Sequence, residues 1–430
     1  MNRPKRLVDF TNWLVPLLYA LGGVIVGLII PRIETRIWPD LLSPMSVSSA
    51  ISIYSAVASG MIALTGIVFS LVFVMVQFSA TAYSPRLVLW IARDPIMSHA
   101  LGVFVATFLY VVAASSGVDR YGSGRVPLVS VAIVFVLLLV SVGMFVAIIH
   151  RVSRLQVNRM LVFTSNQGRL GIGELYPEPA SFVSERADSD FRVGPPSQTL
   201  VHHDRPHCIQ SMDVDGLLHL AEQSGGVIEM LVAVGDTIVE STVLAQVWDA
   251  RAPIDKRKLN ELIRVGDGRT FEQDPKYALR LLVDIAIRAL SPAVNDPTTA
   301  VQALDQIQDL LVRIGGRHLE IQEIRGGDGE LRLVVPFPVW EDFLLLAFDE
   351  IRYYGATSVQ VMRRMTALID DLIAALPPKR HLALRDWQSR IESTVARSFA
   401  DEQEKREAVI ADSQGLGMPR RRAAGRGVDI

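Results

Sequence analysis

The stretch AIRALSPAVNDPTTAVQALD, residues 286–305, decides how the second half of this chain folds. Apolar residues recur every three or four positions as the chain enters it, which predicts an amphipathic helix. Pro292 ends that helix, because a residue before proline is pushed out of the helical region. A second helix begins at Asp296, a typical N-cap, followed by Pro297, a typical first helical residue. We therefore predict two helices, at 271–288 and 298–315, joined by a tight polar elbow.

This elbow is the first candidate site, and two interpretations of it are open. In one, Asp296 does no more than cap its own helix. In the other, exposed amides at the start of the second helix hold an anion or a carbonyl oxygen, so that the elbow is a ligand-binding or interdomain surface. Arg280 and Arg288, four residues either side of Asp284, form a surface ion-pair ladder or join the elbow. The polar residues of the elbow are Ser291, Asn295, Asp296, Thr298 and Thr299.

The composition excludes several kinds of site. The chain has 430 residues, enough for two or three domains, and 50% of them are hydrophobic. A single cysteine, Cys208, excludes a disulfide framework and a cysteine metal cluster. A short histidine cluster, at 202–207, lacks the spacing of a metal site, so we expect no metal and no cofactor. No basic face interleaved with aromatic residues indicates nucleic-acid binding.

The hydrophobic residues concentrate before His150, in four long apolar runs. Each run reaches the roughly twenty residues that are needed to cross a bilayer, so we predict four transmembrane helices. None of the runs contains Asp, Glu, Lys or Arg, which argues against a proton relay or a voltage sensor. The predicted spans are 13–30, 51–78, 96–114 and 126–149.

Lys and Arg residues near the spans predict the orientation of the chain. One side of the membrane carries most of them, at 3, 5, 6, 86, 93, 151, 154 and 159. The other side carries Arg32, Arg36, Arg120 and Arg125, two in each loop. We therefore expect a multi-pass protein of the bacterial inner membrane, with both termini and the whole second half in the cytoplasm.

The second span contains polar positions that form the second candidate site. Thr65, Gly66 and Ser70 could allow close packing between helices, since small residues let backbones approach. Alternatively Ser70 and Gln77, which are two helical turns apart on one face, line a pore together with Thr65. In the first span, Gly22, Gly23 and Gly27 also favour close helix packing.

After the spans we predict a cytoplasmic α+β domain with a small β-sandwich-like unit. Residues 227–247 contain short strands around Gly235-Asp236 and resemble half of a biotinyl or lipoyl carrier. A carrier needs a lysine at its hairpin tip, and no lysine lies between Lys5 and Lys256, so the resemblance covers shape alone. A single charged helix is expected at 382–409. The predicted divisions are 1–155 for the membrane domain, 156–200 for a connecting helix and linker, 201–400 for the α+β domain and 401–430 for a charged, disordered tail.

Four segments together resemble the bacterial predicted-membrane-protein family called domain of unknown function twenty-two fifty-four. They are SPRL at 84–87, QSMDVDGL at 210–217, QDPKYALRLLVDIAIRALSPAVNDPTTAVQALD at 273–305 and LAFDEIRYYGATSVQV at 346–361. The resemblance covers nearly the whole chain, and the elbow is its most specific part. It implies an integral inner-membrane protein with four N-terminal spans and a cytoplasmic domain, and it supplies no catalytic residues.

The leading functional hypothesis is an oligomeric, channel-like or transport-related membrane protein that is tuned by its cytoplasmic domain. Its expected partners are the lipid bilayer and further copies of the same chain, with an ion or small ligand still unidentified. The alternative is a membrane-anchored sensor or scaffold without conduction. An enzyme ranks third, because no nucleophile and base can be paired from the sequence.

Overall fold

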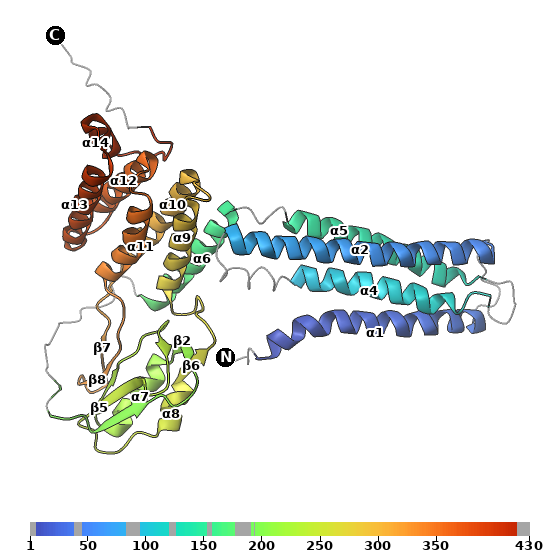
Figure 1. The fold of residues 1–430 in the computed structure, drawn as a ribbon. Helices are drawn as coiled ribbons and strands as arrows, with labels where there is room; N and C mark the ends of the chain where they lie inside the picture. Colours follow the sequence, from blue (N-terminus) through green and yellow to red (C-terminus); the bar gives the residue numbers. More distant parts are fainter. Residues whose placement is uncertain are drawn as a thin grey trace, which may run out of the picture. The chain divides into compact units, whose positions relative to one another are not determined.

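The computed structural model describes residues 6–37, 45–82, 95–119, 126–152, 157–176, 191–192 and 194–418. The chain forms two compact units, Met1–Gln156 and Val157–Ile430, and each is described by itself. Figure 1 shows the elements of both units.

Four long apolar helices make up the N-terminal unit, as the sequence predicts. They are α1 (Arg6–Ile37), α2 (Val47–Ala82), α4 (Pro95–Ser115) and α5 (Leu128–Val152), and they run side by side (Figure 1). Each contains a stretch that is long and apolar enough to cross a membrane: Leu14–Ile37, Val47–Val74, Ile96–Ser115 and Leu128–His150. The predicted fold class is confirmed for this half of the chain.

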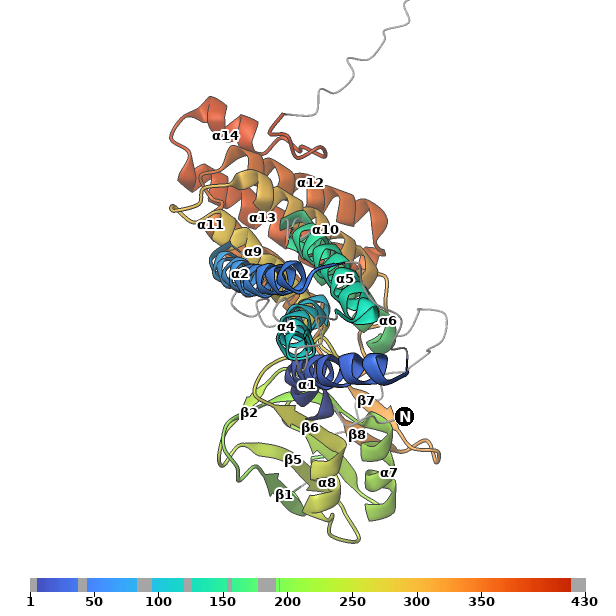
Figure 2. The same cartoon turned by 90° about the vertical axis from the view of Figure 1, so that its right-hand side faces the viewer.

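Helix α4 lies in the middle of the bundle, with α1 on one side and α2 and α5 on the other (Figure 2). Half of its apolar stretch is buried, against 11–17% in the other three helices. Two glycines let α1 approach it closely. An added Cβ at Gly23 would lie 2.5 Å from the Ala106 carbonyl oxygen, and one at Gly27 would lie 2.7 Å from that of Tyr110. The close-packing role predicted for these two glycines is therefore confirmed, whereas Gly22 faces open space.

The first span is longer than predicted. Helix α1 continues past Pro31 to Ile37, and its apolar stretch includes Glu34. The prediction that no acidic or basic residue lies inside a span is therefore wrong. Glu34 is only 2% exposed, because another helix supplies hydrogen-bond donors for its carboxylate, a compensation that a single apolar run cannot reveal.

The C-terminal unit combines a layer of helices with two small sheets, which confirms the predicted mixed α and β class. Helix α9 packs against α6, α10 and α11, and α10 also packs against α12. The two elbow helices therefore form the centre of the helical layer. The helices are α6 (Val157–Leu175), α7 (Val214–Ser224), α8 (Lys256–Leu262), α9 (Pro275–Ala289), α10 (Pro297–Gly315), α11 (Trp340–Tyr354), α12 (Val359–Ala375), η3 (Pro378–Arg380), α13 (His381–Ser398) and α14 (Glu402–Ala408).

The two sheets share one apolar core, which includes Ile209, Ile228 and Val247. The larger sheet has the order β1-β5-β3-β8-β7, and the smaller has the order β4-β2-β6. The strands are β1 (Gln198–Val201), β2 (His207–Met212), β3 (Val227–Met230), β4 (Thr237–Ile238), β5 (Val243–Trp248), β6 (Ile263–Gly266), β7 (Glu323–Arg325) and β8 (Leu331–Val334). The turn at Gly235 thus leads from one sheet to the other, because β3 and β4 belong to different sheets.

The end of the chain is more ordered than the sequence suggests up to residue 418. The single helix expected at 382–409 is two helices, α13 and α14, because Asp401 caps a new helix through the amides of Gln403 and Glu404 at 2.8 and 3.0 Å. The loop after α14 folds around the side chain of Asp412, which is 2% exposed. Its carboxylate accepts from the amides of Gln414, Gly415, Gly417 and Met418. The rest of the expected tail, 419–430, and the SPRL segment lie outside the described residues.

Candidate functional site

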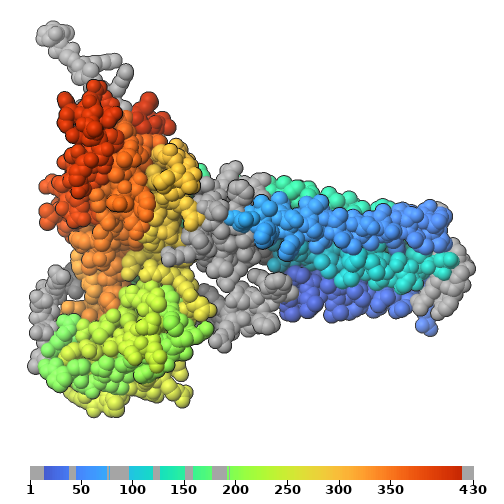
Figure 3. All heavy atoms as spheres, viewed as in Figure 1, coloured from blue at the N-terminus to red at the C-terminus, as the bar shows by residue number. Residues whose placement is uncertain are grey.

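The second span exposes a narrow polar stripe on its outward face. Gly66, Ser70 and Gln77 are all exposed, and they lie close together on a helical projection. Gly66 and Ser70 also line a shallow groove with Ala63, Ile67, Leu71 and Val74. Much of the surface of α2 is in view in Figure 3. An added Cβ at Gly66 would meet nothing within 4 Å, whereas Met61 and Val68 on other sides of α2 are buried.

Thr65 lies apart from this stripe. It is half-buried, and its hydroxyl donates to the Met61 carbonyl of its own helix at 2.7 Å. Such a bond satisfies a hydroxyl in an apolar environment without a partner from another helix. Of the three predicted pore-lining residues, Ser70 and Gln77 share the outward face, and Thr65 is turned away from its centre.

Glu34 is a candidate that the sequence analysis missed. Its carboxylate lies at the start of α5 and accepts from the amides of Val129 and Ser130, at 2.6 and 3.0 Å, and from the Ser130 hydroxyl at 3.0 Å. The first amides of a helix have no partner within that helix, so an acidic group from α1 completes the end of α5. An ionisable residue inside a span is a functional candidate by default. The sequence offered one indication of this position: Glu34 lies about one helical turn after Pro31, so a helix that continues past Pro31 includes it.

The elbow closes on itself. One oxygen of Asp296 accepts from the Thr299 amide at 3.1 Å, and the other accepts from the Thr299 hydroxyl at 2.6 Å. The Ser291 hydroxyl donates to the Arg288 carbonyl at 2.7 Å. Asn295 adopts a left-handed conformation with φ of 47°, which this residue type tolerates better than most. Asp296 therefore caps α10 as the simpler interpretation holds, while Asn295 and Thr298 are exposed at the surface.

The two arginines of α9 differ in position. Arg280 reaches α11, where it donates to both carboxylate oxygens of Glu350 at 2.9 and 2.6 Å, and it also pairs with Asp284 at 2.6 Å. Burial lowers the pKa of Arg280, but its bonds to Glu350 and Asp284 outweigh that effect and raise it. Arg288 stands in the last turn of α9, next to the elbow. A ligand-binding role for the elbow with Arg280 and Arg288 stays a prediction.

A buried acidic group lies where the β turn meets the helical layer. Asp274 caps α9 by accepting from the Tyr277 amide at 3.1 Å. Its second oxygen lies 3.7 Å from Arg269 and accepts no hydrogen bond within the described part of the chain. Burial raises the pKa of Asp274, and the positive charges of Arg269 and Lys276 only partly offset that effect.

The turn beside Asp274 requires a glycine. Gly235 has a φ of 93°, and an added Cβ would lie 2.6 Å from the free oxygen of Asp274. Arg269 donates to the Gly235 carbonyl at 2.8 Å, and the Cys208 thiol contacts the same oxygen at 3.6 Å. Burial raises the pKa of that thiol, which makes it a poor nucleophile at neutral pH. The motifs at 210–217, 227–247 and 273–305, far apart in sequence, thus converge at one junction.

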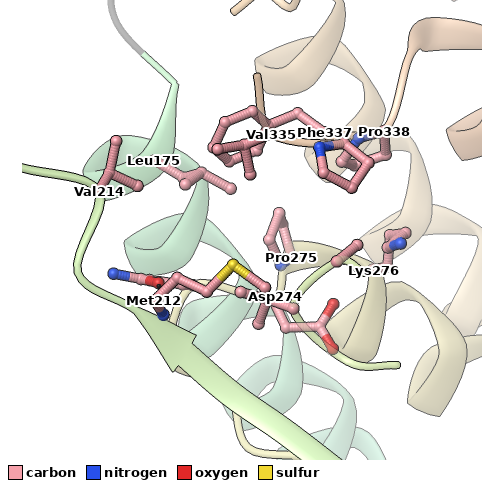
Figure 4. A pocket seen from close by; sticks show the side chains of 13 residues that line it. Leu175, Met212, Val214, Asp274, Pro275, Lys276, Val335, Phe337 and Pro338 are labelled. Carbon is pink, nitrogen blue, oxygen red and sulfur yellow. Dashed lines mark hydrogen bonds between the residues drawn. The ribbon is translucent and has the colours of Figure 1, made fainter. Parts of the chain in front are cut away.

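A narrow cavity lies at this junction (Figure 4). Its volume is about 20 Å³, which is room for about one water molecule. The walls are mainly apolar, with Asp274, Lys276 and Gln273 as polar members; the apolar ones include Leu175, Met212, Val214, Pro275, Val335 and Phe337. The histidine cluster lies elsewhere, with the rings of His202 and His207 5.9 Å apart. Within the described residues, no group of three or more His, Cys, Asp or Glu is arranged to hold a metal ion.

Comparison with known proteins agrees with this architecture. Residues 11–371 match the family described as "Predicted membrane protein (DUF2254)". The chain belongs to this family. The match begins in α1 and ends in α12, so the DUF2254 region includes all four apolar helices, both sheets and the elbow.

Relatives of this DUF2254 protein occur in mycobacteria. Uncharacterized proteins of Mycobacterium bovis and of two strains of Mycobacterium tuberculosis are each 28% identical to it over 425 residues. The similarity covers 94% of this chain and 80% of each relative. No solved structure matches the chain significantly.

Proposed function

We propose that the protein is an oligomeric, channel-like membrane protein in which α2 contributes to a polar path between copies. The observation that supports this proposal is the outward stripe of α2, with Gly66, Ser70 and Gln77 exposed in a single copy. Polar side chains in a bilayer usually face other helices or water. Because α4 occupies the centre of the described bundle, a path between copies accounts for the stripe better than a path through one copy.

In this proposal the protein lies in the bacterial inner membrane with both termini in the cytoplasm. The excess of Lys and Arg at that side supports this orientation. The C-terminal unit then tunes the path, and the elbow is a surface for a ligand or for contact with the membrane unit. Reporter fusions after Ile149 should show a cytoplasmic location, and fusions within 38–44, beyond the end of α1, a periplasmic one. The reverse pattern would overturn the orientation.

Assembly through α2 can be tested by disulfide crosslinking, because the chain has one cysteine to remove. In a Cys208→Ser background, Ser70→Cys should form an oxidised dimer in lipid. The matched control is Leu139→Cys on α5, whose native side chain is 72% exposed. Leu139 should face lipid in the assembly and crosslink poorly. Equal crosslinking at both positions would argue against an interface at α2.

Conduction is tested separately by ion flux in liposomes. Ser70→Leu or Gln77→Leu should lower flux while the crosslinked assembly persists, because each change removes a polar group from the path. Leu139→Ile should leave flux unchanged. Normal flux in both α2 variants would move the path away from this helix.

The second candidate function is a membrane-anchored sensor or scaffold without conduction. The buried Asp274 favours it, since a buried acidic group with a perturbed pKa beside an arginine is a candidate for a functional site. Wild-type protein that assembles in lipid but carries no ion flux at neutral or acidic pH would support this function over the first.

A further inference from the structure

The N-terminal unit contains a buried polar cluster with one member from each of its four helices. Its members are Glu34 of α1, Tyr54 of α2, Tyr110 of α4 and Ser130 of α5, and each is at most 2% exposed. Among the described residues of this unit, Glu34 is the only buried side chain that can carry a full charge at neutral pH. Placing such a group in an apolar bundle is costly, so its partners determine what it can do.

The partners of Glu34 suit the ionised carboxylate. The Val129 amide, the Ser130 amide and the Ser130 hydroxyl all donate to it. A neutral carboxyl group has an O–H of its own, and an amide N–H cannot accept a hydrogen bond from it. Of the three groups, only the Ser130 hydroxyl can accept a hydrogen bond, and it would have to give up its own donation to Glu34 to do so. A neutral Glu34 is therefore better satisfied by a further acceptor.

Tyr54 supplies a free acceptor in the same cluster. Its hydroxyl is buried and has no hydrogen-bond partner within the described residues. It packs in the same cluster of buried residues as Tyr110. The Tyr110 hydroxyl, in contrast, is already engaged, since it donates to the Ser130 carbonyl at 3.3 Å. A buried hydroxyl without a partner calls for an explanation.

We propose that Glu34 is a proton-binding site of the membrane unit and that Tyr54 accepts the hydrogen bond of its protonated form. One proton adds to one carboxylate oxygen of Glu34, the negative charge is neutralised, and the new O–H donates to the phenolic oxygen of Tyr54. In the ionised state, Glu34 holds the end of α1 at the start of α5. Binding of the proton replaces that charged contact with a neutral link between α1 and α2.

Among the described residues, Tyr54 from α2 and Tyr110 from α4 are titratable members of this cluster, and Ser130 is the polar neighbour of Glu34 from α5. On α1 itself, Arg32 and Arg36 are exposed. The proton site does not depend on conduction, so it holds whether the protein is a channel or a sensor.

Infrared difference spectroscopy after a pH change tests this proposal on the full chain in lipid nanodiscs. The carbonyl stretch of a protonated carboxyl group is read directly. Wild type should show a buried-carboxyl band that disappears as the pH rises. Glu34→Gln should lose the Glu34 component of this band and keep the component of the buried Asp274 carboxyl, whereas Glu240→Gln, which alters an exposed glutamate, should keep both.

Tyr54→Phe keeps Glu34 and removes only the proposed acceptor. The band should move to higher frequency in this variant, because a carboxyl group without an acceptor has a stiffer carbonyl bond. Tyr110→Phe is the matched control: its hydroxyl is held on the Ser130 carbonyl, so the band should stay in place if Tyr54 is the acceptor. The proposal is overturned if Glu34→Gln gives the wild-type difference spectrum or if Tyr54→Phe does not move the band. The Tyr54 comparison decides the matter if Glu34→Gln fails to fold.

Discussion

In the N-terminal unit, polar side chains join one helix to another, whereas in the C-terminal unit many of them cap the helix that they precede. Glu34 of α1 completes the end of α5, and the Thr107 and Ser141 hydroxyls meet across α4 and α5 at 3.1 Å. Asp274 and Asp296 instead cap α9 and α10, the helices that follow them directly. The difference teaches that a polar group in lipid must find its partner in its own helix, as Thr65 does, or on a neighbouring helix, as Glu34 does, since water is not available there.

Glycine shows the same contrast. Gly23 and Gly27 have ordinary helical conformations and allow α1 to approach the backbone of α4. Gly225 and Gly235 have φ values of 71° and 93° and allow the chain to turn. In the bundle, therefore, glycine provides close helix contact, and in the C-terminal unit it provides backbone freedom.

Replacing Glu34 with leucine should have the largest effect on this comparison. The change leaves two amides and a hydroxyl at the start of α5 without their acceptor. Each buried donor left unpaired costs about 1–3 kcal/mol, so we expect a loss of about 3 kcal/mol or more in stability. Unfolding in mixed detergent micelles measures it. Glu34→Gln retains one oxygen acceptor and should lose less. A leucine variant as stable as wild type would show that α5 does not need its partner from α1.

The glycine contrast predicts the next largest effect, in a pair of variants on α1. In Gly27→Ala, the new Cβ would lie 2.7 Å from the Tyr110 carbonyl oxygen and 2.8 Å from the Ala113 Cβ. Overpacking of this kind costs about 1–3 kcal/mol. In Gly22→Ala, the Cβ meets nothing within 4 Å, so stability should hardly change. The same unfolding assay compares them, and equal behaviour of the two variants would refute close packing at Gly27.

Local capping in the C-terminal unit predicts a smaller effect at the elbow. Asp296→Ala removes the acceptor for the Thr299 amide and should cost about 0.5–2 kcal/mol. Asp296→Asn should be nearly harmless, because asparagine caps a helix about as well. Melting temperature and ion flux should be measured for both. If Asn keeps full stability but abolishes flux, the charge of Asp296 has a functional role beyond capping.

The smallest expected effect is a change in how the stability of the folded chain depends on pH, and it comes from Asp274. Burial raises the folded-state pKa of this carboxyl above its ordinary value. The folded chain then holds its proton more tightly than the unfolded chain does, so stability is greatest at low pH and falls as the pH rises through the folded pKa. Asp274→Asn can still cap α9 and should flatten this part of the profile of melting temperature against pH.

Asp328 is the matched control, with the opposite sign. Its hydrogen bond with Arg332 lowers its pKa, so its stabilising contribution is present at neutral pH and is lost as the pH falls. Asp328→Asn should leave unchanged the part of the profile of melting temperature against pH that is due to Asp274. An unchanged slope in Asp274→Asn would show that this carboxyl titrates normally.

Much of the architecture could be predicted from local patterns. The bounds of α10, predicted at 298–315, differ from the structure by one residue, because Asp296 and Pro297 provide strong start signals. The candidate sites were harder to predict. The spacing of Ser70 and Gln77 places them on one face of α2 and Thr65 off that face, and their role in lining a path stays a prediction. The cavity at Asp274 depends on three distant segments and has no local signal.

The sequence by itself determined the four apolar helices, the elbow and its cap, and the mixed α and β character of the second unit. These features follow from hydrophobic length, proline and capping residues, which act within a few positions of the chain. Only the tertiary structure decided that Glu34 lies inside the bundle, that β3 and β4 join different sheets, and that Asp274 meets Gly235. Each of these depends on a partner from a distant segment, because a buried charge or a tight backbone approach is tolerated only where that partner satisfies it.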